Sequence, residues 1–371
     1  MAFSFSFAGD DIEDDDQSLT SPPPPRILSN KIDAASPSGA GAFPVQGKPL
    51  LPPASHDLSH MISRLPSKIA FSLLDVDLED GSTLQIPRRE LWDVRVQLMA
   101  EDDAEGPSES EAGLGEHDVK TGIYEGGFKS WESSVDLVKV LASQNSADAL
   151  NSDPCVLVEL GCGTALPSLA LFQWALAARN SGPKNPLVIA VSDYNPSVLY
   201  LVTLPNIILA WALQQRGQLP ILDEAFTADG ELELTPEVLQ AFQDSLKSCQ
   251  ITLSFLSGAW SPEFVDLLYN SAFPPSLGAG AKTLVLGSET IYSPFALESF
   301  SNTLLSVLQR ELQERPSGNA RAIIAAKKLY FGVGGSLDDF VDKMRGLGAT
   351  IETLFEEPRG VVRGVVGCQL S

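Results

Sequence analysis

The stretch from Val156 to Ser168, VLVELGCGTALPS, constrains the fold of this chain more than any other. Apolar residues run into Glu159, after which Gly161 and Gly163 precede an Ala/Leu-rich segment. This order predicts a buried strand, a glycine turn and a helix. Glycines let the backbone turn sharply there, and they let ligand atoms approach closer than a Cβ would allow. A small-molecule cofactor is therefore expected on this turn.

Strand and helix patterns alternate beyond the turn. Strands are expected over residues 186–195, 251–258, 283–292 and 321–332, a helix over 337–348, and two further β runs over 351–357 and 361–370. Nearly continuous apolar strands that alternate with helices predict a parallel sheet covered on both faces. The two closing runs predict an antiparallel edge. The expected fold class is α/β, with a Rossmann-like sheet whose carboxyl edge carries the functional residues.

The N-terminal third is expected to be looser. Residues 1–55 are acidic and then rich in Pro, Ser and Gly, which predicts a disordered tail. The FSFSF run at its start has the period of a strand, so it is either a docking motif that pairs with a sheet edge or a chance aromatic tail. Residues 56–118 are expected to form a small cap followed by an acidic linker.

Within the cap, a helix is expected near 58–65, a strand near 69–76 and a strand or helix start near 88–99. His56 and His60 are four apart, but no third ligand accompanies them, so they are expected to be surface histidines and not metal ligands. Residues 214–248 are expected to be an insertion whose own helix begins at Thr235-Pro236.

Charge and cysteine content exclude several classes of function. The formal charge is −23 with only 25 basic residues, which argues against a nucleic-acid binder and is compatible with a basic protein partner or with ordinary solubility. The four cysteines form no CxxC pair and no signal peptide is evident, so we expect a reducing compartment, no disulfide and no metal site. The longest apolar run, Val198–Leu213, is shorter than a bilayer span and is expected to be a buried helix.

Two acids at strand ends indicate which cofactor the turn holds. Asp193 ends the strand after the turn, where a carboxylate can accept hydrogen bonds from the two ribose hydroxyls of an adenosine. A dinucleotide fingerprint would require a third glycine where this chain has Leu166. S-adenosylmethionine carries no phosphate and has a cationic amino-acid end, which Glu159 suits. The pattern therefore favours S-adenosylmethionine over NAD.

Several blocks together closely resemble the histidine protein methyltransferase family of seven-β-strand, S-adenosylmethionine-dependent enzymes. They are YEGGFKSWESSVDL, VELGCGTALPS, SDYNPSVLYLVTLPN, LGSETIYSP and AAKKLYFGVGGS. The resemblance covers about residues 119–371 and implies that this part is a class I methyltransferase domain with a seven-stranded Rossmann-like sheet. It extends weakly toward the N-terminus through FSFSF and RRELWDVRVQLM.

The same resemblance implies an activity. Enzymes of this family methylate the Nε2 (tau) nitrogen of one histidine in a basic protein of the large ribosomal subunit, the third in that subunit's numbering. We accordingly expect a cytoplasmic and nuclear monomer that contacts this protein and neither nucleic acid nor membrane. A lysine methyltransferase of the same fold and a non-catalytic chaperone of a basic ribosomal protein are the alternatives.

The resemblance also implies which residues line the cofactor pocket or its mouth. They are Trp131, Glu132, Glu159, Gly161, Cys162, Gly163, Asp193, Asn195, Trp260 and Ser288. Ala259 departs from the family pattern, in which an acid precedes the Trp. The partner of the adenine amine therefore stays open, and Trp260 either binds the cofactor or only packs.

Methylating a histidine asks for positioning more than for acid–base chemistry. A histidine side chain with a pKa of about 6.5 is mostly neutral at pH 7, whereas a lysine with a pKa of about 10.4 must first lose a proton. The ring must be held as the tautomer whose other nitrogen carries the proton. Glu289 and Tyr292 are the candidate acceptors for that N–H, with a backbone carbonyl as the rival; alternatively, both residues only brace their loop.

Overall fold

In the computed structural model, Pro37–Ser371 form one compact unit. The structure describes residues 44, 46–105, 119–120, 124–125, 127–146, 150, 152–182, 184–330 and 334–370. The FSFSF run and the acidic run after it lie outside the described residues. Most of the expected acidic linker, residues 106–118, lies outside them as well.

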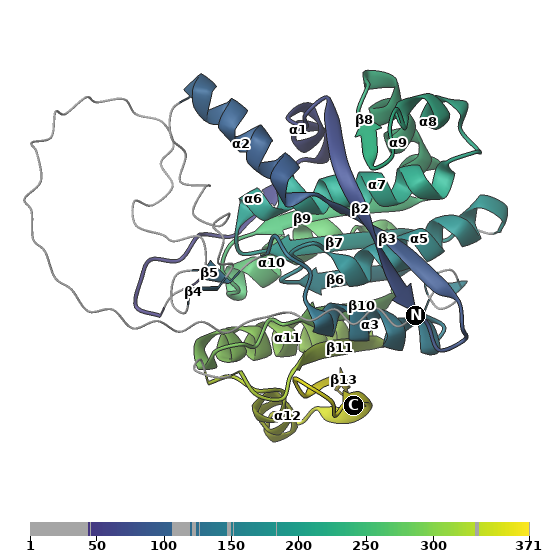
Figure 1. Cartoon of the computed structure of the whole chain (residues 1–371). Helices are drawn as coiled ribbons and strands as arrows, with labels where there is room; N and C mark the ends of the chain where they lie inside the picture. Colours follow the sequence, from purple (N-terminus) through teal and green to yellow (C-terminus); the bar gives the residue numbers. More distant parts are fainter. Residues whose placement is uncertain are drawn as a thin grey trace, which may run out of the picture. The chain divides into compact units, whose positions relative to one another are not determined.

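An eight-stranded sheet in the order β1-β9-β7-β6-β10-β11-β13-β12 forms the centre of the fold (Figure 1). Its strands are β1 (Ala54–His56), β6 (Cys155–Leu160), β7 (Leu187–Asp193), β9 (Ile251–Ser257), β10 (Lys282–Ser288), β11 (Ala320–Lys327), β12 (Thr350–Glu357) and β13 (Arg363–Gln369). The five strands from β9 to β11 are parallel, and β13 runs antiparallel to both of its neighbours. Without β1, this is the expected seven-stranded Rossmann-like sheet.

The chain changes direction across the sheet between β6 and β10. From β6 it proceeds outward through β7 to β9, and it then returns to the other side of β6 to build β10 and β11. Such a switch point is where open α/β sheets bind ligands, at the carboxyl ends of the strands. The two closing strands run antiparallel to each other, as expected, but β13 lies inside the sheet and β12 forms this edge.

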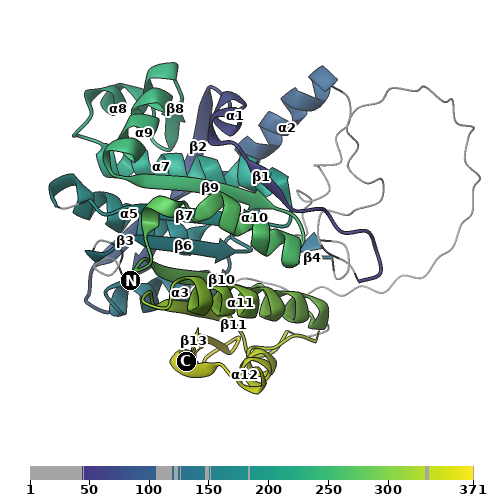
Figure 2. The same cartoon turned by 180° about the vertical axis from the view of Figure 1, so that it is seen from behind.

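Helices cover both faces of this sheet, as the apolar strands predict (Figures 1 and 2). Along β6, Leu157 faces a core cluster with α3 (Glu132–Ser143), α5 (Leu166–Ser181) and α7 (Leu204–Gln215). Val156 and Val158 face a second cluster with α10 (Pro262–Ala272), α11 (Pro294–Glu314) and α12 (Leu337–Gly346). Successive residues of a strand point to opposite faces, so the fully buried run CVLVEL supplies both cores.

The cap and the insertion, expected as separate pieces, share one small sheet. The cap contains α1 (Leu58–Ser63), β2 (Lys68–Asp77), β3 (Thr83–Arg89) and α2 (Leu91–Glu105), and the insertion contains α8 (Pro220–Ala225), β8 (Glu231–Glu233) and α9 (Pro236–Ser248). β2 pairs antiparallel with β3 on one side and with β8 on the other. The Thr235 side chain caps α9 at the Val238 N–H, as the Thr-Pro pair predicts. Smaller elements are β4 (Val119–Lys120), β5 (Tyr124–Glu125) and the 3-10 turn Pro275–Leu277.

Two expectations about the N-terminal part change. The boundary expected at residue 55 falls inside β1, which pairs antiparallel with β9, and α2 continues to Glu105 through the start of the expected linker. His56 is half-buried, with its Nε2 2.8 Å from Ser257 Oγ, and burial lowers its pKa, whereas His60 is exposed. Among the described residues, no group of three or more His, Cys, Asp or Glu side chains could hold a metal ion.

The long apolar run is a buried helix, as expected. Residues Pro196–Gln215 are long and apolar enough to span a membrane, with a mean hydropathy of 1.6, but 83% of that window is buried within the protein. The run comprises α6 (Pro196–Val198), a π-helical turn η2 (Leu199–Thr203) and α7. The buried side chain of Asn206 on α7 donates to Thr164 O at 3.0 Å and accepts from Arg89 N at 2.7 Å. This side chain therefore joins the glycine turn to the cap.

We expect Asn206→Ala to lower the free energy of unfolding by about 1–3 kcal/mol, because two buried backbone groups lose their hydrogen-bond partner. Urea unfolding followed by circular dichroism measures the change. Asn302→Ala removes an exposed asparagine that bonds Glu298 within α11, and it should stay within about 0.5 kcal/mol of the natural protein. Equal losses for the two variants would contradict this structural role.

Candidate functional site

A cavity of about 400 Å3 opens at the carboxyl ends of the central strands, within the range of roughly 300–1,000 Å3 typical of small-molecule sites. It lies at the switch point of the sheet, where β6 and β10 are neighbours. All but two of the site residues expected from the sequence line it. Those that do are Trp131, Glu159, Gly161, Cys162, Gly163, Asp193, Trp260, Ser288, Glu289 and Tyr292.

The two remaining residues lie outside the lining. Glu132 is exposed in the first turn of α3. Asn195 is buried and caps α6, where its side chain accepts from Ser197 N at 3.0 Å. Its own backbone N–H donates to Asp193 Oδ1 at 3.0 Å. Asn195 therefore supports the cavity through Asp193.

The two glycine positions of the turn have no room for a side chain. Gly161 and Gly163 adopt φ angles of 70° and 51°, in the left-handed region that favours glycine. A Cβ on Gly161 would lie 2.7 Å from Thr290 Cγ2, and one on Gly163 would lie 3.0 Å from Gly127 O. The buried Cys162 thiol between them lies 3.8 Å from Thr203 Oγ1, and burial raises its pKa well above the usual value. All four cysteines of the chain are buried and free.

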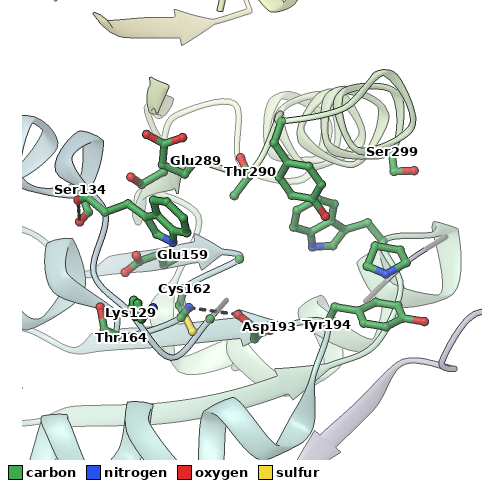
Figure 3. A pocket seen from close by; sticks show the side chains of 18 of the residues that line it. Lys129, Ser134, Glu159, Cys162, Thr164, Asp193, Tyr194, Glu289, Thr290 and Ser299 are labelled. Atoms are coloured by element: carbon green, nitrogen blue, oxygen red, sulfur yellow. Dashed lines mark hydrogen bonds between the residues drawn. The ribbon is translucent and has the colours of Figure 1, made fainter. Parts of the chain in front are cut away.

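Glu159 and Asp193 end neighbouring strands, and each is tied to a helix or turn backbone. Glu159, which is 1% exposed, accepts from the N–H of Ser168 at 3.1 Å and from its hydroxyl; burial raises the pKa of this carboxyl to about 8. Asp193 accepts from Gly163 N at 3.1 Å, the bond drawn in Figure 3, and burial raises its pKa to about 6. Burial therefore disfavours the charged form of both carboxyls, and a ligand that offers hydrogen bonds or positive charge would favour it.

Glu289 occupies the far side of the cavity in a strained backbone conformation. Its φ angle is 57°, which is uncommon for a residue with a side chain and is often found at functional sites. Its two carboxylate oxygens accept hydrogen bonds from the Ser133 hydroxyl and, at 2.5 Å, from the Tyr330 hydroxyl. Burial raises the pKa of Glu289, while the positive charge of Lys327 opposes that rise.

Sequence reasoning missed the residues that surround Glu289. Lys327 Nζ lies 5.1 Å from the ring centroid of Trp131 and 5.7 Å from that of Tyr330, within the range of cation–π contact. Ser133 and Tyr330 bond the Glu289 carboxylate directly. The signal was present, because all three residues lie in blocks that carry the family resemblance. Within the last block, residues 331–333 lie outside the described residues.

Apolar and aromatic side chains form the opposite wall. Trp260 packs edge-on against Phe300 with ring centroids 5.4 Å apart, and Tyr194 lines the cavity beside Asp193. In Figure 3, Tyr194 and Glu289 lie at opposite ends of the pocket with Asp193 between them. The site thus combines an aromatic end, two acids around a glycine turn and a third acid at the far end.

No family model matches the chain, but curated relatives do. Histidine protein methyltransferase 1 of Saccharomyces cerevisiae is 35% identical over 92% of this chain and 89% of its own length. The protein of the same name from Schizosaccharomyces pombe is 34% identical over 79% of this chain and 77% of its own length.

Solved structures give much weaker likenesses. The human methyltransferase 10 domain containing protein covers 76% of this chain and 99% of its own, at 11% identity and a TM-score of 0.35. Magnesium protoporphyrin IX methyltransferase from Synechocystis, solved with bound SAM, covers 66% of this chain and 86% of its own, at 13% identity and a TM-score of 0.29. The assignment depends on the two yeast relatives, and on their evidence this chain belongs to the histidine protein methyltransferase family.

Proposed function

We propose that this protein transfers a methyl group from S-adenosylmethionine to the Nε2 (tau) nitrogen of a histidine in a basic protein of the large ribosomal subunit, the third in that subunit's numbering. One observation supports the chemistry above others: a single cavity joins the glycine turn, two buried strand-end acids and the braced carboxylate of Glu289. The yeast relatives, by their names, methylate protein histidine.

The cavity residues fit S-adenosylmethionine. Asp193 would hold the ribose hydroxyls, Glu159 the cationic amino-acid end, and the aromatic wall with Tyr194 and Trp260 the nucleobase. Two lining hydroxyls, Ser288 Oγ and Thr290 Oγ1, are buried without a hydrogen-bond partner in the part of the chain that the structure describes. When bound, the cofactor supplies an electrophilic methyl group on a sulfonium sulfur. Leu166 begins α5 where a dinucleotide site would need glycine.

Glu159 makes cofactor binding a proton-linked event. Its pKa near 8 means that the carboxyl is mostly protonated at pH 7 in the ligand-free protein. A cation bound beside it favours the charged carboxylate and lowers that pKa. Binding at pH 7 should therefore release a proton, and affinity should rise as the pH approaches 8.

We expect calorimetric titration of S-adenosylhomocysteine at pH 7 to show proton release, measured as a binding enthalpy that varies with the ionisation enthalpy of the buffer. Glu159→Gln should abolish most of the release and weaken binding, because the amide carries no proton to lose. Glu237→Gln, an exposed change on α9, is the matched control and should behave as the natural protein. Unchanged proton release in Glu159→Gln would exclude this role.

At the other end of the cavity, Glu289 is the proposed acceptor that holds the substrate ring. A neutral histidine can present Nε2 to the methyl group while its Nδ1–H donates to the carboxylate, which fixes the required tautomer. The hydroxyls of Ser133 and Tyr330 and the charge of Lys327 favour the ionised, accepting form of Glu289 against the effect of burial. Each carboxylate oxygen has two lone pairs, so both can accept a further bond. Tyr292, which also lines the cavity, is the alternative acceptor.

We expect Glu289→Gln to lower kcat by about 10²-fold, at the lower end of what a positioned proton-handling group contributes, with little change in cofactor affinity. Steady-state methylation kinetics and a parallel cofactor titration separate the two effects. Tyr292→Phe distinguishes the candidates, since it should leave kcat within a few-fold if Glu289 is the acceptor. A larger loss in Tyr292→Phe than in Glu289→Gln would assign the role to the tyrosine.

The substrate enters a cavity with an exposed apolar rim. Leu329 and Val361, which line the cavity, are 52% and 45% exposed, so a bound polypeptide could cover them. The formal charge of −23 favours a basic partner by long-range attraction. We place the protein in the cytoplasm and nucleus, where it would act as a monomer on the ribosomal protein without contacting nucleic acid or membrane.

Incubating the purified candidate ribosomal protein with this protein and labelled S-adenosylmethionine should add one methyl group to one histidine, at Nε2, as fragment mass spectrometry and amino-acid analysis would establish. Asp193→Ala should abolish transfer because cofactor binding is lost. Methyl groups on lysine would instead indicate a lysine methyltransferase of the same fold. Cofactor binding without any transfer would mean that the substrate assignment is wrong.

A further inference from the structure

The segment Leu50–His56 precedes β6 in the chain by about a hundred residues, yet Leu50 lines the cavity and Leu51 bonds Tyr194. Leu50 lines the cavity together with Tyr194, Ala259 and Trp260. Leu50 is also 39% exposed, although it is apolar. A leucine that faces a pocket while open to solvent becomes buried when a ligand fills that pocket.

Backbone hydrogen bonds hold this segment to two strand ends. Leu51 N donates to the Tyr194 hydroxyl at 3.0 Å, and Ala259 N donates to Leu51 O at 2.9 Å. Tyr194 follows β7 and Ala259 follows β9, and both residues line the cavity. The two main-chain groups of Leu51 therefore tie together the loops beside Asp193 and before Trp260.

The rest of the segment is fixed on the sheet edge. Ala54 pairs with Ser257 and His56 with Phe255 in the antiparallel ladder between β1 and β9, and His56 Nε2 lies 2.8 Å from Ser257 Oγ. Gly258 follows β9 with a φ angle of 100°, and a Cβ there would lie 2.4 Å from Pro52 O. The loop after β9 thus has a glycine where the segment crosses it.

We propose that Leu50–His56 is the outer wall of the nucleobase end of the cofactor pocket, with the Leu50 side chain covering the base and Leu51 holding Tyr194 and the Ala259 loop in place. The assignment to this end follows from the order of residues in the cavity. Asp193, the ribose acid, lies between Tyr194 and Glu289 (Figure 3), so the base lies beyond it on the Tyr194 side. This inference rests on the proposed function for the identity of the cofactor.

The proposal also accounts for Ala259. The loop SGAW offers no acidic side chain to an adenine amine. The backbone N–H of Ala259 in this loop donates to Leu51 O. Recognition at this end would then come from enclosure between apolar and aromatic surfaces, with the N-terminal segment as one of them. Small-molecule sites generally gain affinity from such apolar burial, with few polar groups to fix orientation.

Titration of the full-length protein with S-adenosylhomocysteine tests this wall. Leu50→Ala removes only an exposed side chain and should weaken binding about fivefold, while Gly258→Ala, which displaces Pro52, should weaken it about tenfold or more. Leu312→Ala, an equally exposed leucine on α11, and Gly278→Ala are the matched controls and should bind as the natural protein does. Gly278 also has a positive φ, of 74°, but no described atom lies within 4 Å of an added Cβ.

Hydrogen exchange adds a readout that does not depend on affinity. The backbone amides of Leu50, Leu51 and residues 54–56 should exchange more slowly when S-adenosylhomocysteine is bound, because the ligand holds the segment against the sheet. If Leu50→Ala and Gly258→Ala both bind S-adenosylhomocysteine as tightly as the natural protein, the segment is not a wall of the pocket, and the proposed function is unaffected. If Gly258→Ala fails to fold, Leu50→Ala decides alone. Failure of the natural protein to bind S-adenosylhomocysteine would overturn the cofactor assignment and the wall with it.

Discussion

The backbone of Gly163 is the point on which the site depends. Its N–H donates to Asp193 Oδ2 at 3.1 Å, and its carbonyl accepts from Thr203 Oγ1 at 2.7 Å. These bonds join the turn after β6 to the end of β7 and to the π-helical turn that leads into α7. Buried backbone groups are costly when unpaired, so the three elements are held in one arrangement. The cavity floor is therefore set by main-chain contacts, and the lining side chains are arranged around it.

The acids of the cavity are all destabilised as carboxylates by burial, but their surroundings differ. Only hydrogen bonds from Ser168 oppose this effect at Glu159, whereas backbone N–H donors oppose it at Asp193, and two hydroxyls and a nearby lysine oppose it at Glu289. The pKa of Glu159, near 8, is accordingly higher than that of Asp193, near 6. A bound cation would therefore change the ionisation of Glu159 more than that of Asp193, which is already mostly ionised at neutral pH and can accept hydrogen bonds.

The sequence predicts the central unit well because its signals are local. Apolar runs, the glycine spacing and the Thr235-Pro236 helix start all act within a few residues, and the strands, the turn and the insertion helix lie where they are expected. Contacts between distant residues leave no such pattern. Leu51 and Tyr194 are 143 residues apart, and Ser133 and Glu289 are 156 apart. Both the pairing of β1 with β9 and the bracing of Glu289 arise only when the sheet order brings these segments together.

The strained backbone at Glu289 shows why the far end of the site needs the whole sheet. A left-handed conformation costs a residue with a Cβ roughly 1–2 kcal/mol, so other contacts must hold it. The Glu289 N–H donates to Ala325 O on β11 at 3.0 Å, and its carboxylate is bonded by Ser133 on α3 and by Tyr330 after β11. These contacts exist only because β10 lies between β6 and β11. The strand order that creates the switch point therefore also fixes the Glu289 carboxylate at the far end of the cavity.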